Sequence, residues 1–263
     1  MEFEGIVNVR DLGGLRIGER TVRRGLLLRT AHLHDATDAD VARLRDHYRL
    51  RRIFDFRTRD EATAQPDRDI PGAEHIFLPT LDIEAERRSG EAVPAETWLD
   101  LPSHIVRLSF NRVFQRKAKE LYPSLVLSDF SQLQYAAFLN MVLETPDGAC
   151  LWHCSQGKDR TGIGAAFLLG ALGADRQTIV ADFDRSNDAY RNLVDRFCVK
   201  VASLGGGDEE KDVVRAFMGV STRNFIRTLD MIDERWGSLE AFILSQLDLT
   251  PDDLAVLRSR YLE

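Results

Sequence analysis

A short polar loop between two apolar segments dictates much of how this chain can fold. Residues 149–153 form an apolar run of strand length, residues 153–162 read HCSQGKDRTG, and residues 163–169 continue as an apolar run of helical type. A strand, a tight loop and a helix in this order direct backbone N–H groups and the positive end of the helix toward one point. Consecutive amides in such a turn form a concave anion site. The segment predicts an α/β fold that binds an anion at the end of a strand.

Two side chains of this loop carry nucleophilic and cationic chemistry. Cys154 lies at the base of the loop, where the positive field of the amides stabilises a thiolate, the form in which cysteine attacks. Five residues separate it from Arg160, so the loop can return the guanidinium to the side of the sulfur. A guanidinium fork binds two phosphoryl oxygens at once. The pattern predicts phosphoryl transfer, with Cys154 as the nucleophile and Arg160 as the phosphate clamp.

The other loop residues are predicted to bind the phosphoryl group. Gly157 permits tight curvature, Lys158 adds a second cation, and Thr161 offers a hydroxyl to the sulfur or to the departing phosphate. The predicted substrate-binding residues are Ser155, Gln156, Gly157, Lys158 and Thr161. A nucleotide-binding loop is excluded, because Asp159 follows Lys158 and Trp152 occupies the place of the first glycine.

The loop resembles the signature of the protein tyrosine phosphatase superfamily, which is His-Cys, five residues, Arg, and then Ser or Thr. The run at 157–162 narrows the resemblance to the PtpB-like tyrosine phosphatases of bacteria and fungi. Segments similar to that family also fall at residues 8–14, 29–33, 55–61 and 182–187. Phe183 stands where the family more often has a tyrosine, which is a conservative departure.

The resemblance implies a cysteine-phosphatase fold, a phosphocysteine intermediate and no metal or organic cofactor. It also implies that His153 orients the loop without acting as a base, and that Asp159 takes a catalytic part. In that family an inserted helical lid covers the active site.

Two carboxylates compete for the role of general acid, because a tyrosine oxygen leaves far better once it is protonated. Asp159 lies within the loop itself. Asp82 follows a predicted strand, at the sheet edge where functional loops gather. Either could instead be structural, Asp159 by pairing with Lys158 and Asp82 by capping a helix. Asp159 is preferred, and Asp82 remains the alternative.

Short apolar runs alternate with helical patterns through the first two thirds of the chain. A helix is expected to begin at Thr37 or Asp38. The final third is expected to be helical, with one helix ending at Gly237 and another beginning at Pro251. The predicted strands are residues 26–28, 52–56, 75–78 and 149–153. We expect a central, mostly parallel sheet with helices on both faces and an all-helical C-terminal part.

No linker divides the chain, so residues 1–263 are expected to form a single phosphatase domain. A helical lid insertion is expected at about residues 84–128. Within it, residues 101–119 carry basic side chains and no acid. Such a segment could draw an anionic substrate toward the site. The alternative is an amphipathic helix with a solvated basic face. The sequence GGG at 205–207 and the charged run at 208–212 are expected to form a flexible connection.

Charge and cysteine content narrow the possible classes. The net charge of −7 argues against broad nucleic-acid binding. No apolar run reaches the ~18–20 residues that span a bilayer, and the N-terminus does not resemble a signal peptide. A cytoplasmic protein without integral membrane association is expected, with export without a cleavable signal left open. The 3 cysteines make no disulfide framework. Cys150 and Cys198 are expected to be buried, a redox role for Cys150 being a minor alternative, and no metal site is predicted.

The predicted function is hydrolysis of phosphotyrosine-type monoesters by a cysteine-dependent protein tyrosine phosphatase. Its expected partners are phosphorylated proteins or phosphoinositides as substrates, with phosphate as product. A dual-specificity or phosphoinositide phosphatase is the alternative, because Lys158 adds positive charge beside Arg160. A catalytically silent phosphoprotein-binding module is less favoured, since Cys154 and Arg160 are both present.

Overall fold

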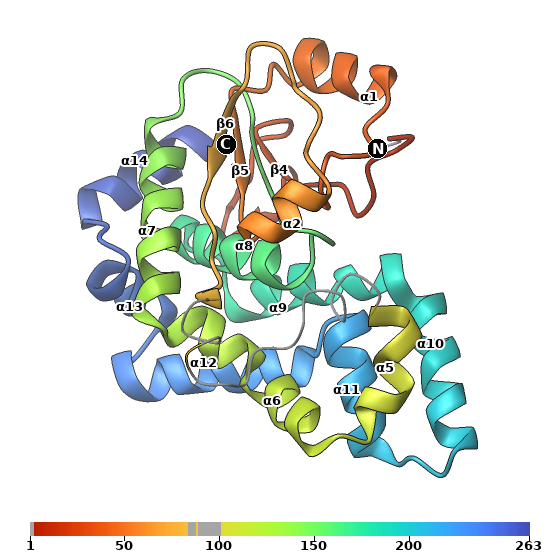
Figure 1. Cartoon of the computed structure of the whole chain (residues 1–263). Coiled ribbons are helices and arrows are strands. Elements are labelled where there is room, and N and C mark those ends of the chain that lie inside the picture. Colours follow the sequence, from red (N-terminus) through yellow and green to blue (C-terminus); the bar gives the residue numbers. More distant parts are fainter. Residues whose placement is uncertain (1–2, 84–87, 89–100) are drawn as a thin grey trace.

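The computed structural model describes residues 3–83, 88 and 101–263 (Figure 1). Its centre is a five-stranded sheet in the order β1-β4-β7-β5-β6. β7 pairs in parallel with β4 and β5, β6 pairs in parallel with β5, and β1 is antiparallel to β4. The strands of this sheet are β1 (Arg10–Asp11), β4 (Leu27–Thr30), β5 (Arg52–Asp55), β6 (Glu74–Phe77) and β7 (Cys150–His153). The predicted mostly parallel sheet is confirmed. A separate hairpin joins β2 (Arg16–Ile17) to β3 (Arg20–Thr21).

Thirteen helical segments are described, and several begin or end where the sequence predicts. They are α1 (Asp38–Ala42), η1 (Arg43–His47), α2 (Arg59–Ala64), α5 (Leu101–Ser109), α6 (Arg112–Leu127), α7 (Asp129–Glu144), α8 (Asp159–Leu172), α9 (Arg176–Asp184), α10 (Ser186–Ser203), α11 (Asp208–Met218), α12 (Thr222–Trp236), α13 (Leu239–Gln246) and α14 (Pro251–Tyr261). Thr37 caps α1, Gly237 ends α12 in a left-handed conformation, and Thr250 caps α14 ahead of its first-turn proline.

Alternating strand residues point to opposite faces of the sheet, and helices cover both. Leu28, Ile53 and Leu151 belong to a cluster that includes residues of α1 and η1. Their neighbours Leu27, Phe54 and Trp152 belong to the larger cluster, which includes residues of α7, α8 and α12 to α14. Every residue of α8 from Thr161 onward is buried. This explains why the helix is apolar on all sides.

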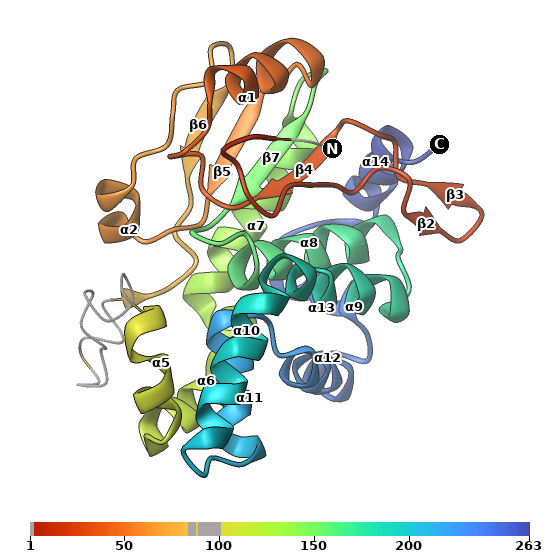
Figure 2. The same cartoon turned by 90° about the vertical axis from the view of Figure 1, so that its right-hand side faces the viewer.

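α5, α6, α10 and α11 form a helical lobe beside the sheet (Figure 2). A third apolar cluster, which includes Ile105, Phe114, Val201 and Phe217, holds the lobe together. In the predicted lid at 84–128, residues 84–87 and 89–100 lie outside the described residues. The part from 101 to 127 is packed into the lobe as α5 and α6. That residues 84–128 cover the site as a lid, and that residues 1–263 form a single domain, therefore remain predictions.

The flexible connection expected at 205–212 is only partly observed. Leu204 and Gly205 form a turn after α10, but Asp208 begins α11. The acids at the start of this helix suit the positive end of its dipole, and Glu210 accepts a hydrogen bond from the N–H of Gly207 at 2.8 Å. No helix in the described part of the chain is long and apolar enough to cross a membrane.

Candidate active site

The loop that follows β7 lies at the carboxyl end of the central strand, between that strand and α8. Cys154 is the first residue after β7 and is only 2% exposed. Asp159 and Arg160 form the first turn of α8. The N-terminus of a buried helix and the nucleophile therefore face the same small volume, as the strand–loop–helix pattern predicts.

The carbonyl groups of the loop are held from behind. Asn8 donates from Nδ2 to the oxygens of Gln156 and Gly157, at 3.1 and 2.9 Å. Arg29 donates from Nη2 to the oxygen of Gly157 at 3.0 Å, and the hydroxyl of Tyr190 donates to the oxygen of Gln156 at 2.7 Å. Because the carbonyls point into this scaffold, the amides of the same peptides point away from it.

Those amides have the properties of an anion site. The N–H groups of residues 155–158 donate to no acceptor among the described residues. Gly157 allows this turn, since its φ is 65° and a Cβ there would lie 2.2 Å from the oxygen of Thr30. A side chain at this position would both strain the backbone and clash with β4.

A buried charge network fixes the scaffold itself. Arg29 forms an ion pair with Asp182 at 2.5 Å, and both side chains are almost completely buried. Arg10 binds the same carboxylate at 3.2 Å and donates to the hydroxyl of Ser186 at 2.8 Å. Asp182 belongs to the segment at 182–187 on which the family resemblance partly rests, but the sequence did not reveal this contact with Arg29.

Arg160 is oriented by a partner that the sequence analysis missed. Its Nη1 and Nη2 donate to the two carboxylate oxygens of Glu61 at 2.6 and 2.7 Å, and Nη2 is 3.4 Å from the hydroxyl of Ser155. Burial by itself lowers the pKa of Arg160, but the negative charges of Glu61 and Cys154 raise it above its ordinary value. Arg160 is therefore a permanent cation, held in one orientation beside Cys154.

Glu61 is fixed by the start of α2. Its carboxylate accepts hydrogen bonds from the N–H of Thr58 at 2.8 Å and from the hydroxyl of Ser155 at 2.6 Å. Burial by itself raises the pKa of Glu61, but Arg160 and these donors lower it far below its ordinary range. The capping box formed by Thr58 and Glu61 was a readable sequence signal, but it predicts a helix start and not a partner for Arg160.

Asp159 and Lys158 are paired with each other. The ammonium of Lys158 donates to Oδ2 of Asp159 and, at 2.8 Å, to the oxygen of Gly219. Lys158 is only 3% exposed. Oδ1 of Asp159 accepts a hydrogen bond from the hydroxyl of Tyr122 at 2.9 Å, and that hydroxyl accepts one from the N–H of Ser221 at 3.0 Å. The second cation of the loop is therefore opposed by the candidate acid.

The remaining predicted residues lie around this centre. Nδ1 of His153 is 3.4 Å from the carbonyl oxygen of Cys154, a position suited to orienting the loop. The hydroxyl of Thr161 is buried and has no hydrogen-bond partner among the described residues. Asp82, the alternative acid, follows β6, and its Oδ2 lies 3.9 Å from Nη2 of Arg88.

Cys150 is fully buried, and its Sγ lies 3.2 Å from the hydroxyl of Thr145. Burial raises the pKa of its thiol.

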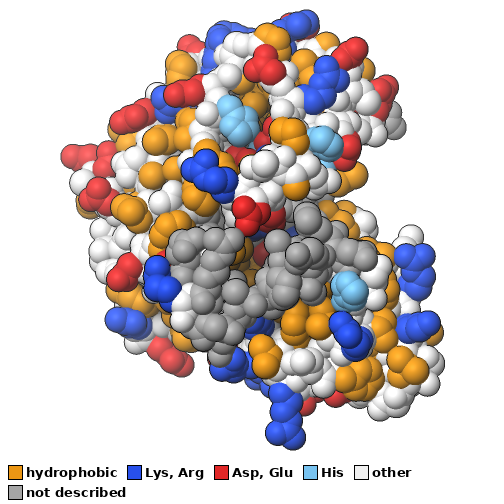
Figure 3. All heavy atoms as spheres, in the orientation of Figure 1, with side chains coloured by type: hydrophobic (Ala, Val, Ile, Leu, Met, Phe, Trp, Pro, Cys, Tyr) orange, Lys and Arg blue, Asp and Glu red, His pale blue; other side chains and the backbone are white. Residues whose placement is uncertain are grey.

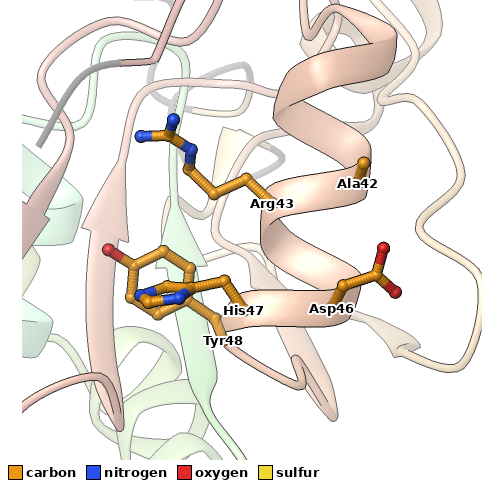
Figure 4. A pocket seen from close by; sticks show the side chains of 5 residues that line it. All are labelled: Ala42, Arg43, Asp46, His47 and Tyr48. Atoms are coloured by element: carbon orange, nitrogen blue, oxygen red, sulfur yellow. The ribbon is translucent and has the colours of Figure 1, made fainter.

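The hollow drawn in Figure 4 is a different feature. It is lined by Ala42, Arg43, Asp46, His47 and Tyr48, all from α1, η1 and the residue after them. None of the predicted site residues lines it, so we assign it no part in the chemistry.

Comparisons of sequence and of structure relate this chain to known proteins. The whole chain, residues 1–263, matches the sequence model of a family described as the tyrosine phosphatase family. It is 29% identical over 264 residues to a protein of Cupriavidus necator that is named provisionally as a tyrosine-protein phosphatase, covering 100% of this chain and 88% of that protein. It is 28% identical over 264 residues to the triple specificity protein phosphatase PtpB of Mycobacterium tuberculosis, covering 92% of each chain. The crystal structure of P. aeruginosa TpbA aligns with 15% identity and a TM-score of 0.33, covering 80% of this chain and 89% of TpbA.

Proposed function

This chain belongs to the tyrosine phosphatase family, and from that premise we propose that it hydrolyses phosphotyrosine-type monoesters with Cys154 as the nucleophile. One observation carries the proposal. Arg160 is held beside Cys154 by a bidentate ion pair with Glu61, in a loop whose N–H groups at 155–158 meet no acceptor in the part of the chain that the structure describes. That arrangement supplies a nucleophile, a cationic fork and N–H donors for the equatorial oxygens of a phosphoryl group.

In the first step the sulfur of Cys154 attacks phosphorus, a sulfur–phosphorus bond forms and the bond to the tyrosine oxygen breaks. Asp159 protonates the departing oxygen, which turns a poor leaving group into a neutral phenol. Arg160 and the loop amides hold the phosphoryl oxygens in line, where positioning and charge stabilisation contribute most of the catalysis.

In the second step water attacks the phosphocysteine. Asp159, now a carboxylate, accepts the proton of the water, the sulfur–phosphorus bond breaks, and phosphate leaves. The hydroxyl of Thr161 is buried in the first turn of α8 and has no hydrogen-bond partner among the described residues, and we assign it the role of donor to the departing sulfur.

The nucleophile is tested by Cys154→Ser, with Cys198→Ser as the matched control. We expect Cys154→Ser to abolish turnover of a phosphotyrosine peptide yet still bind phosphate or vanadate, because the amides and Arg160 remain. Cys198, which is half-buried in the helical lobe, should tolerate the same change. Substantial turnover by Cys154→Ser would overturn the mechanism, and an inactive wild type that binds phosphopeptide would favour a silent binding module.

A broader specificity is the second candidate. The Mycobacterium tuberculosis relative is named a triple specificity phosphatase, and the loop of this chain contains Lys158. Because the ammonium of Lys158 is buried and paired with Asp159, we expect Lys158→Ala to reduce the rates on a phosphoinositide and on an aryl phosphate by similar factors. A selective loss on the phosphoinositide would show that Lys158 binds its additional phosphates and would favour the broader specificity.

The expected partners and location are part of the same proposal. On the face shown in Figure 3, the described basic side chains are interspersed with acidic ones, which suits a local anion site better than a nucleic-acid surface. We propose phosphorylated protein as the substrate and the cytoplasm as the location. Fractionation of cells that express the protein tests the latter.

A further inference from the structure

Behind the phosphate-binding loop lies a second group of ligand-type side chains that the proposed reaction does not use. Asp55, Asp67, His75 and His153 bring one ligand atom each to within 4.8 Å of the others. Oδ2 of Asp67 is 3.0 Å from Nε2 of His75 and 3.1 Å from Nε2 of His153. The two imidazoles come from β6 and β7, so the sheet itself sets the spacing.

His153 is the unusual member of this group. Its side chain is completely buried, and its Nε2 faces Oδ2 of Asp67 at 3.1 Å. Its Nδ1 faces the carbonyl oxygen of Cys154 at 3.4 Å. A proton on Nδ1 leaves a lone pair on Nε2, which then points at a carboxylate oxygen. Two electron-rich atoms at this distance are stable only when a cation or a proton lies between them.

From this geometry we propose a site for a divalent cation of the zinc type, with His75, His153 and Asp67 as its protein ligands. Zinc binds nitrogen and carboxylate oxygen at about 2.0–2.2 Å in a tetrahedron, whose ligands are then about 3.3–3.6 Å apart. The observed 3.0 and 3.1 Å are close to that edge. The side chain of His75 is 41% exposed, so a cation can reach the group from solvent.

The surrounding groups suit the role of outer partners. Arg57 donates from Nη2 to Oδ2 of Asp67 at 2.6 Å and binds both oxygens of Asp55. Each oxygen of Asp55 accepts two donors from Arg57, whereas Oδ2 of Asp67 accepts one and keeps a second lone pair for the cation. The N–H of Leu33 fixes the other oxygen of Asp67 at 2.6 Å. The two carboxylates and one guanidinium of this group sum to one negative charge, which attracts a cation. Metal ligands in proteins are oriented by such outer hydrogen bonds.

The position of the site connects it to the nucleophile. His153 directly precedes Cys154 and contacts its carbonyl oxygen. A cation on Nε2 would therefore hold the ring that supports the base of the loop.

Direct metal binding tests the proposal without any need for turnover. Cys154→Ser is the parent protein, because the catalytic thiol could bind zinc itself, and Cys150 and Cys198 are kept in every variant. We expect calorimetric titration of this parent with Zn²⁺ to show a site that His75→Gln weakens by tenfold or more. His47→Gln, which changes an exposed histidine of η1, should leave that affinity unchanged.

Cobalt supplies an independent signature. Co²⁺ added to the Cys154→Ser parent should give the visible absorption of a tetrahedral nitrogen and oxygen site, and His75→Gln should lose it. Equal zinc affinity with and without His75→Gln, or a parent that binds no zinc, would overturn the assignment. Neither result bears on the phosphatase mechanism, which Cys154→Ser tests by turnover.

Discussion

Among single residues, Glu61 should affect catalysis strongly although it does not itself react, because it orients Arg160. It is the only carboxylate recorded against the guanidinium of Arg160 in the described part of the chain. We expect Glu61→Gln to lower kcat/KM by about 10²-fold, because a misplaced clamp loses alignment with the phosphoryl oxygens. Steady-state rates on a phosphotyrosine peptide measure this effect.

Thr58→Ala is the control for that change. It removes the helix cap at the start of α2 without touching Arg160, and should cost about 1 kcal/mol of stability. If Thr58→Ala loses as much activity as Glu61→Gln, the effect comes from the helix and not from the orientation of Arg160.

The identity of the general acid is also decided at single residues. An enzyme that lacks its acid must expel an unprotonated oxyanion, so its rate depends steeply on the pKa of the leaving group. We expect Asp159→Asn to slow tyrosine-like leaving groups far more than activated phenols, and Asp82→Asn to show a smaller contrast. Rates across a series of substituted phenyl phosphates test this, and a steep dependence in Asp82→Asn alone would reverse the two roles.

At the scale of elements, the loop between β7 and α8 depends on the backbone of Gly157. We expect Gly157→Ala to abolish vanadate binding and reduce turnover by more than about 10²-fold, because a misplaced loop cannot present its donors. Gly18, in the β2–β3 hairpin, has φ of 60° and open space around it. Gly18→Ala should therefore cost about 1 kcal/mol and spare activity. Vanadate binding by Gly157→Ala at wild-type affinity would show that the loop tolerates a side chain.

A second element-scale contact joins the helical lobe to the loop. Tyr122 of α6 has its oxygen occupied by the N–H of Ser221, so its proton is directed to Asp159. Without this donor the carboxylate of Asp159 loses a contact that fixes its position. We expect Tyr122→Phe to lower kcat/KM on a phosphotyrosine peptide several-fold, measured by steady-state rates. In an Asp159→Asn background the same change should have little further effect, and a comparable loss there would show that Tyr122 acts on another group.

For the whole molecule, buried carboxylates predict the response to acid. Burial by itself raises the pKa of Asp40, but hydrogen bonds from the N–H groups of Glu4, Gly5 and Thr37 lower it below its ordinary value. The pKa of Glu61 is also lowered. A carboxyl whose pKa is lower in the folded state than in the unfolded state, where it is about 4, stabilises the fold at higher pH. This stabilisation is lost as the pH falls from the unfolded-state pKa toward the folded-state pKa. We therefore expect the free energy of unfolding to decrease as the pH drops below about 4.

Asp40→Asn isolates one share of this effect. It should be less stable than the wild type at pH 7 and should lose less stability between about pH 5 and pH 3. Urea unfolding across this range supplies the comparison. An identical pH dependence in the two proteins would remove Asp40 from the account of acid sensitivity.

Much of the fold was predictable because its signals lie between neighbours in the chain. The strand that ends at His153, the cap at Thr250 and the stop at Gly237 each depend on residues within a few positions. The same holds for the strand–loop–helix segment around Cys154, where the turn, the dipole and the nucleophile are consecutive.

The contacts that complete the site were not predictable in this way. Arg160 meets Glu61 across 99 positions, Arg29 meets Gly157 across 128, and Lys158 reaches the carbonyl of Gly219 across 61. The sequence left open whether Lys158 is an additional cation for the substrate or a partner of Asp159, and the structure shows the pairing with Asp159. Local sequence determined the elements and the chemistry of the loop, because backbone conformation depends on adjacent residues. Only tertiary packing decided which charges meet, because buried charges must find partners wherever the fold brings them together.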